Sequence, residues 1–170
     1  MDPELIEALR RGSGIGLRGD GTFTFRERPV EHPRVQALFH RGVRMRADGE
    51  VVLEVGGQWC FVACEGMARF VEAVRAERGG LVVRFAGGEE LRVSAAICGY
   101  GPDDRLYLWS EEAAGPALLQ RGAHQAVLAH LGEDLVARFD GAEVVVVRLA
   151  RVPARDEPPP ARDEAPVGGG

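Results

Sequence analysis

The sequence contains no lysine and no asparagine, and isoleucine occurs only at Ile6, Ile15 and Ile97. All 21 basic residues are therefore arginine. The three depleted residue types have AT-rich codons, so the composition indicates a GC-rich bacterial genome, and the arginine content reflects codon usage first. The net charge is −5. Because nucleic-acid-binding proteins usually need a basic footprint, we do not expect a nucleic-acid partner.

Long hydrophobic runs are also absent. A membrane-spanning helix needs about 18 or more consecutive apolar residues, and a run such as Val144–Val147 has only the length of a strand. The N-terminal stretch MDPELIEALRR lacks the charged-then-apolar order of a signal peptide. The sequence therefore predicts no contact with a membrane and a cytoplasmic location.

Cysteine is scarce, with residues at positions 60, 64 and 98. An odd count without a signal peptide favours reduced thiols over a disulfide framework. Cys60 and Cys64 are separated by three residues, but a structural zinc site needs four ligands and no second pair completes one. We expect buried free thiols, no metal site and no cofactor.

Turn and capping residues divide the rest of the chain into short helices and strands. The predicted helices cover 3–11, 33–42, 67–79 and 116–131. The third rests on Met67, Phe70, Val71 and Val74, whose spacing of i, i+3, i+4, i+7 is typical of an amphipathic helix. The predicted strands are 22–26, 43–46, 51–55, 59–63, 81–85, 91–93, 106–109, 136–139 and 144–149, and we expect 12–21 and 98–104 to be turn or loop.

The order of these elements predicts an α+β fold with mostly antiparallel sheets and three main helices. We expect one globular domain over 1–150, followed by a disordered proline-rich and acidic tail over 151–170, because the tail has no apolar periodicity. A proline-rich docking segment is the alternative for this tail.

Sliding the chain by 84 residues superimposes a β-α-β-β pattern at 21–64 on a second one at 105–149. His40 then falls on His124, and the segment 51–55 falls on 135–139. The fold would then consist of two related lobes, and a cleft between them would be the default ligand site. Coincidence of a common pattern is the alternative.

The common catalytic motifs fail on their context. Gly14, Gly16 and Gly19 match a dinucleotide fingerprint, but that fingerprint needs a strand before it and a helix after it. Here a helix precedes and a strand follows, so we expect a flexible turn. No serine lies in a nucleophile elbow, and the paired acidic residues read as turn and edge positions. His32, at a helix start, has a sufficient role as a cap.

One basic cluster stands out between residues 26 and 46. Its arginines outnumber Glu27 and Glu31 to give a local net charge of +4. Such a surface suits a phosphorylated ligand or an acidic partner, and the alternative is a solvated, salt-bridged face. The candidate binding residues are Arg26, Arg28, Arg34, His40, Arg44 and Arg46.

Several segments resemble a bacterial family, domain of unknown function 1285. The matching segments are GDGTFTFRERPV (19–30), VQALFHRGVRMRADGEVVL (35–53), VVRFAGGEELRV (82–93), ALLQR (117–121) and VARFDGAEVVVV (136–147). The chain departs from that family at Glu54-Val55-Gly56-Gly57, where the family has a Thr-Pro-Val-Glu stretch, and in lacking aromatic residues directly after Arg121. The resemblance implies a non-catalytic protein with a repeated α+β motif and a role in signal transduction, and it supplies no catalytic residues.

The sequence therefore favours a non-catalytic regulatory module that binds an unknown protein partner or a small anionic ligand. The alternative is a small enzyme acting on an anionic metabolite, with His32 and His40 on one face of a helix. The sequence does not decide between a monomer and a homodimer.

Overall fold

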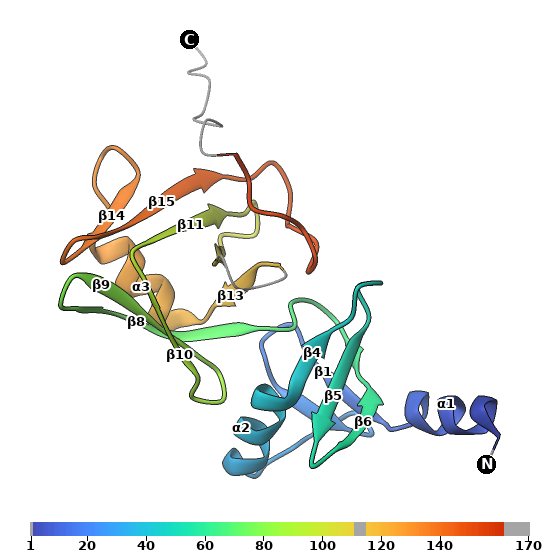
Figure 1. Cartoon of the computed structure of the whole chain (residues 1–170). Helices are drawn as coiled ribbons and strands as arrows, with labels where there is room; N and C mark the ends of the chain where they lie inside the picture. The colour runs from blue at the N-terminus through green and yellow to red at the C-terminus, as the bar shows by residue number, and fades with distance from the viewer. Residues whose placement is uncertain (1, 111–114, 162–170) are drawn as a thin grey trace. The chain divides into compact units, whose positions relative to one another are not determined.

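The computed structural model describes residues 2–110 and 115–161 (Figure 1). The chain divides into two compact units. Unit 1 comprises the residues up to 69 together with 86–88, and unit 2 comprises 70–85 and the residues from 89 onwards. Within the described residues there are three helices and mostly antiparallel strands, so the α+β class predicted from the sequence is confirmed.

Unit 1 contains two small sheets and two helices. One sheet has the order β3-β2-β1-β7, and the other has the order β4-β5-β6. The elements are α1 (Pro3–Arg11), β1 (Ile15–Leu17), β2 (Phe23–Phe25), β3 (Arg28–Pro29), α2 (Pro33–Gly42), β4 (Val43–Met45), β5 (Val51–Val55), β6 (Gln58–Phe61) and β7 (Ala63–Cys64). Phe23, Leu17, Val51 and Leu53 are among its buried apolar side chains.

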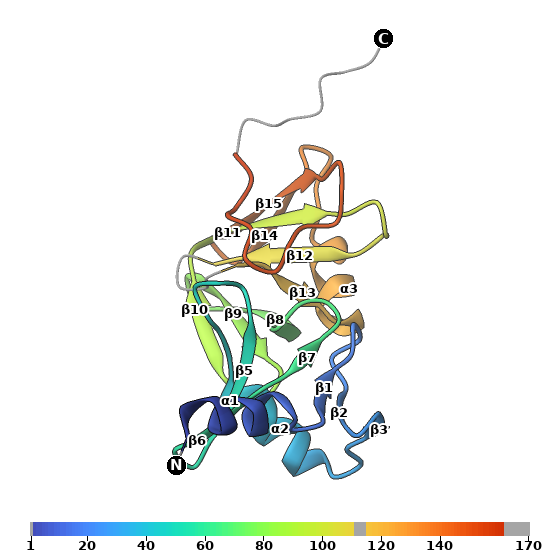
Figure 2. The same cartoon turned by 90° about the vertical axis from the view of Figure 1, so that its right-hand side faces the viewer.

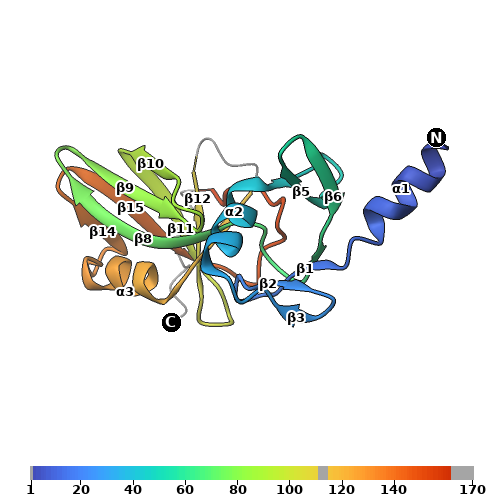
Figure 3. The same cartoon turned by 90° about the horizontal axis from the view of Figure 1, so that it is seen from below.

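Both helices of unit 1 begin where local capping signals lie. The Asp2 carboxylate accepts a hydrogen bond from the Glu4 main-chain nitrogen (3.0 Å), and Pro3 follows at the first helical position. His32 caps α2 through Nδ1, which accepts from the Arg34 main-chain nitrogen (3.3 Å). The α1 helix lies beside β6 and buries no side chain (Figure 3).

The turn expected at 12–21 contains a strand instead. Strand β1 pairs antiparallel with β2 and parallel with β7. Gly16 lies in this strand, where an added Cβ would come within 2.7 Å of the Thr24 hydroxyl oxygen. Gly16 of the apparent dinucleotide motif therefore allows close strand packing and does not lie in a flexible turn.

Unit 2 is an eight-stranded sheet with one helix, α3, which contacts β8, β13 and β14 (Figure 1). The strand order is β10-β9-β8-β13-β12-β11-β15-β14. The elements are β8 (Phe70–Glu77), β9 (Gly80–Phe85), β10 (Glu90–Val93), β11 (Ala95–Tyr100), β12 (Leu106–Trp109), β13 (Ala117–Leu119), α3 (Arg121–Ala129), β14 (Val136–Phe139) and β15 (Ala142–Arg148). Its core contains Val71, Val83, Cys98, Val127 and Val144.

The helix predicted over 67–79 is wrong, because Phe70–Glu77 form strand β8. The register of β8 against β9 shifts between Val71 and Ala73, which is a β-bulge. Val71 is a core residue and Val74 packs against the same core. A bulge that places residues three apart on one face imitates the spacing of a helix, and this explains the error.

Two further predictions in unit 2 need correction. The stretch 98–104, expected as a loop, begins inside β11, which lies between β12 and β15. The helix expected from Pro116 begins only at Arg121, because 117–119 form β13 between β12 and β8. Strand pairing on both sides outweighs the helical preference of Ala117, Leu118 and Leu119.

The two units contain hairpins with the same register. Val52 pairs with Phe61 across β5 and β6, and Val136 pairs with Val145 across β14 and β15, 84 positions later in each strand. The strands that precede the two ranges agree as well, since β1 and β11 each have one antiparallel and one parallel neighbour. This agreement supports a duplication of 21–64 and 105–149, which remains a proposal.

The residues after β15 have no helix or strand up to position 161. Pro153 is nevertheless buried, and the Glu157 main-chain oxygen accepts a hydrogen bond from the Trp109 indole (2.8 Å). These contacts were not indicated by composition. The disorder expected over 151–170 stays a prediction, and its last part, 162–170, lies outside the described residues.

Candidate functional site

The β2–β3 hairpin of unit 1 carries the first two candidate arginines (Figure 2). Phe25 pairs with Arg28, so Arg26 and Glu27 form a two-residue turn between the strands. Both turn residues adopt left-handed backbone conformations, with φ of 47° at Arg26 and 68° at Glu27. Phe25 remains 49% exposed, and the Arg26 guanidinium lies 5.2 Å from the centre of its ring. We call Phe25, Arg26, Glu27 and Arg28 the basic tip.

Residues on either side of β1 hold the basic tip through hydrogen bonds. The Arg26 main-chain nitrogen donates to the Gly14 oxygen (2.8 Å), and Arg18 donates from its guanidinium to the Glu27 main-chain oxygen (3.0 Å). These two hydrogen bonds fix the turn from outside its own hairpin. Neither Gly14 nor Arg18 was a candidate residue, and only the pairing of β1 with β2 reveals their role.

The third candidate, Arg34, lies in the first turn of α2 and is exposed. In the described part of the chain, Arg26, Arg28 and Arg34 lie beyond ion-pair distance of any carboxylate. A salt-bridged face would have placed Glu27 or Glu31 against them. The three exposed guanidinium groups therefore have no ion-pair partner among the described residues.

The other two arginines serve the fold locally. Arg44 donates from one guanidinium nitrogen to the main-chain oxygens of Arg41 (2.6 Å) and Val43 (2.8 Å). Arg46 pairs with Asp48 (3.7 Å) and lies 5.4 Å from the centre of the Phe61 ring. Three of the six candidates, Arg26, Arg28 and Arg34, thus have exposed side chains. Arg44, Arg46 and His40 instead contact groups within the fold.

His40 also has a structural role. Its Nε2 donates a hydrogen bond to the Gly21 main-chain oxygen (2.8 Å), and its ring packs edge-on against Phe23 with 4.8 Å between the ring centres. His32 is occupied as the cap of α2. The two histidines that motivated an enzymatic alternative therefore hold the two ends of one helix.

The cysteine thiols and the tyrosine hydroxyl groups are accounted for by burial or by contacts with nearby residues. Cys98 is fully buried, which raises the pKa of its thiol to about 12, while Cys60 and Cys64 are half-buried. Tyr107 donates its hydroxyl proton to Asp103, and Tyr100 donates to Asp104. Among the described residues no group of three His, Cys, Asp or Glu side chains is arranged to hold a metal ion. No described helix is long and apolar enough to cross a bilayer.

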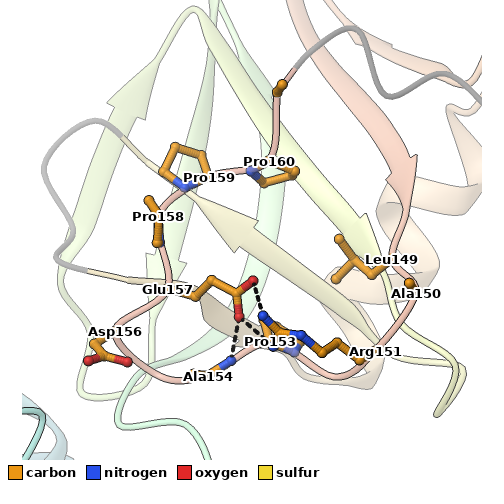
Figure 4. A pocket seen from close by; sticks show the side chains of 11 residues that line it. Leu149, Ala150, Arg151, Pro153, Ala154, Asp156, Glu157, Pro158, Pro159 and Pro160 are labelled. Carbon is orange, nitrogen blue, oxygen red and sulfur yellow. Dashed lines mark hydrogen bonds and ion pairs between the residues drawn. The ribbon is translucent and has the colours of Figure 1, made fainter.

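An open pocket of about 750 Å³ lies in unit 2 and is lined entirely by the stretch 149–161 (Figure 4). At its centre Arg151 and Glu157 form an ion pair (2.9 Å), and the Glu157 carboxylate also accepts from the Ala154 main-chain nitrogen (2.8 Å). Three successive prolines, Pro158–Pro160, form another part of the wall. Because its charged pair is mutually satisfied, the pocket offers less for ligand recognition than the basic tip.

No protein-family model matches the sequence, and no curated protein matches it significantly. Two solved structures are similar. The crystal structure of a DUF1285 family protein from Silicibacter pomeroyi DSS-3 has 15% sequence identity and a TM-score of 0.59, covering 78% of each chain. A DUF1285 family protein from Shewanella baltica OS155 has 18% identity and a TM-score of 0.47, covering 64% of this chain and 85% of that one. The likeness to the first structure confirms a DUF1285-like fold.

Proposed function

Starting from a DUF1285-like fold, we propose that this chain is a non-catalytic regulatory module that binds an acidic partner through Arg26, Arg28 and Arg34. The observation that carries the proposal is the absence of carboxylate partners around these three arginines in the described residues. An unpaired guanidinium keeps its donors available for a carboxylate or phosphate, which it binds in a planar, bidentate geometry. A cytoplasmic signalling role belongs to the same proposal.

The enzymatic alternative receives less support. A catalytic histidine needs a ring nitrogen directed at substrate and a partner that orients the ring. His40 directs Nε2 at the Gly21 main-chain oxygen, and His32 uses Nδ1 as a helix cap. A binding role therefore accounts better for the exposed basic residues of unit 1.

The experiment compares the full chain, purified from its own host, with two charge-reversed variants. Arg28→Glu combined with Arg34→Glu changes the proposed surface. Arg105→Glu combined with Arg148→Glu is the matched control, because both residues are exposed and lie in unit 2. Native mass spectrometry then measures the retained protein partner or small anion.

We expect the wild type and the control to retain the same bound species and the Arg28/Arg34 variant to lose it. Retention should also fall as salt is raised, because ions screen exposed charges beyond roughly 10 Å at 0.1 M. If all three proteins carry the same bound species, the basic surface has no part in binding and the proposal fails.

A further inference from the structure

The turn of the basic tip departs from the other hairpins of this protein. Two-residue turns also join β5 to β6, β8 to β9, and β14 to β15. Each of those has glycine at its second central position, with positive φ at Gly57, Gly79 and Gly141. Among the two-residue turns in the described ranges, only Arg26–Glu27 lacks a glycine. A left-handed backbone conformation is unfavourable for arginine and glutamate. Hairpins with two-residue turns of this conformation prefer Asn-Gly at the two turn positions.

The strain is maintained by two hydrogen bonds from outside the hairpin, from Arg26 to Gly14 and from Arg18 to Glu27. Residues held in sparsely populated conformations persist only where the surroundings determine them, and such residues cluster at functional sites. The backbone strain of this turn is therefore a second feature, independent of charge, that marks the basic tip as a functional surface.

The strain holds an aromatic ring and a guanidinium side by side. A Cβ added to Gly14 would lie 3.2 Å from Arg26 Cγ and 3.6 Å from Phe25 Cε2, so both side chains pack over this glycine. Phe25 nevertheless stays 49% exposed at the end of β2. The result is an exposed hairpin end in which the Phe25 ring lies beside the Arg26 guanidinium, and Phe25 pairs with Arg28 on the neighbouring strand.

We infer that Phe25 is an anchor residue, and that the basic tip inserts it into an apolar pocket with an acidic rim on a protein partner. The inference rests on the proposed function and specifies its partner. Small ligands bind in concave pockets that bury most of their surface, whereas the basic tip is the exposed end of a hairpin. Aromatic and arginine side chains that fill a partner's pocket carry most of the binding energy in protein interfaces. An acidic rim complements Arg26 and Arg28.

The test begins with the photo-reactive residue p-benzoylphenylalanine, placed at position 25 of the full chain expressed in its own host. We expect a discrete cross-linked protein that disappears when Arg28→Glu and Arg34→Glu are added. The same residue at position 128, an exposed leucine of α3 in unit 2, is the control and should give no such product. Absence of a specific product at position 25 overturns the inference.

The cross-linked protein is then purified and titrated with variants of the full chain. Phe25→Ala should weaken its affinity at least tenfold with the charge unchanged, while Leu128→Ala should leave it unaltered. If Arg28→Glu with Arg34→Glu abolishes binding but Phe25→Ala binds within twofold of wild type, the proposed function stands and the anchor is wrong. If neither weakens binding, both fail.

The turn itself provides a separate check on folding. Glu27→Gly relieves a strained position and keeps the main-chain oxygen that accepts from Arg18. Its melting temperature should rise by about 2–4 °C, the size of change expected for a chain of this length. A fall in melting temperature would show that the turn is not strained and would remove this support for the inference.

Discussion

The indole nitrogen of Trp109, in β12, donates a hydrogen bond to the main-chain oxygen of Glu157 (2.8 Å), which lies in the segment after the last strand. Trp109 is buried, so its indole N–H needs an internal acceptor. This hydrogen bond ties the stretch around Glu157 to the sheet of unit 2. It gives a defined position to a part of the chain whose composition predicts disorder.

Replacing Trp109 by phenylalanine should release this stretch. The variant loses the hydrogen bond that the buried indole donates to the Glu157 main-chain oxygen. We expect its free energy of unfolding to fall by about 1–2 kcal/mol. Trypsin should cleave after Arg151 and Arg155 several-fold faster than in the wild type. Trp59→Phe is the control, because Trp59 is only half-buried and lies in unit 1. Equal cleavage rates in the wild type and Trp109→Phe would contradict the anchoring role.

Acidification should loosen the same stretch. The hydrogen bond from the Ala154 main-chain nitrogen, together with the Arg151 guanidinium, holds the pKa of Glu157 below its ordinary value. A carboxylate with a lowered pKa in the folded state stabilises that state above its unfolded pKa, and this contribution is lost as the pH falls through the folded value.

We therefore expect the amide protection of Ala154 to decline at acidic pH, below the ordinary pKa of a glutamate. Hydrogen exchange, corrected for its intrinsic pH dependence, measures this change. In Glu157→Gln the protection should be weaker at neutral pH and should not decline further with acid. A pH profile that is the same in both proteins would show that Glu157 does not hold the stretch.

Two glycines allow a matched test of packing. Gly42 ends α2 and is buried, and an added Cβ would collide with the main-chain oxygen of Glu54. Gly42→Ala should therefore destabilise the fold by about 3 kcal/mol, since backbone cannot move aside easily. Gly122 lies in α3, where a Cβ would make an ordinary contact of 3.5 Å with the Glu72 oxygen. Gly122→Ala should stabilise the fold by about 0.5–1 kcal/mol, as urea denaturation would show.

His40 distinguishes a structural role from a catalytic one. His40→Ala removes the hydrogen bond to Gly21 and the edge contact with Phe23, and we expect a loss of about 1–2 kcal/mol in urea denaturation. His40→Gln, which keeps a donor, should recover part of the loss. A catalytic role would instead be indicated by unchanged stability in both variants together with loss of a measurable turnover.

Local signals in the sequence predict the elements that depend on nearby residues. The helix over Pro33–Gly42 follows from its capping residues, and the hairpin after it follows from Asp48-Gly49. Strand β8 could not be found in this way, because the bulge between Val71 and Ala73 alters the alternation that identifies strands. Strand β13 was missed because its residues favour a helix in isolation.

The candidate site shows the same division. Charge counting along the sequence found Arg26, Arg28 and Arg34, but it added Arg44 and Arg46, which contact groups within the fold. His40, chosen for its place on a helix, donates to the Gly21 main-chain oxygen. Phe25 carried no signal of its own, since Phe23 has the same alternation and is completely buried.

The sequence by itself determined the α+β class, the helix caps and the glycine turns, because each depends on interactions within a few residues. Only the tertiary structure decided which apolar segments became strands, because strand pairing depends on partners far away in the chain. It also decided which charges remained available. Whether an arginine meets a carboxylate, a main-chain oxygen or solvent is fixed by the elements packed beside it, as Arg46 and Arg28 show.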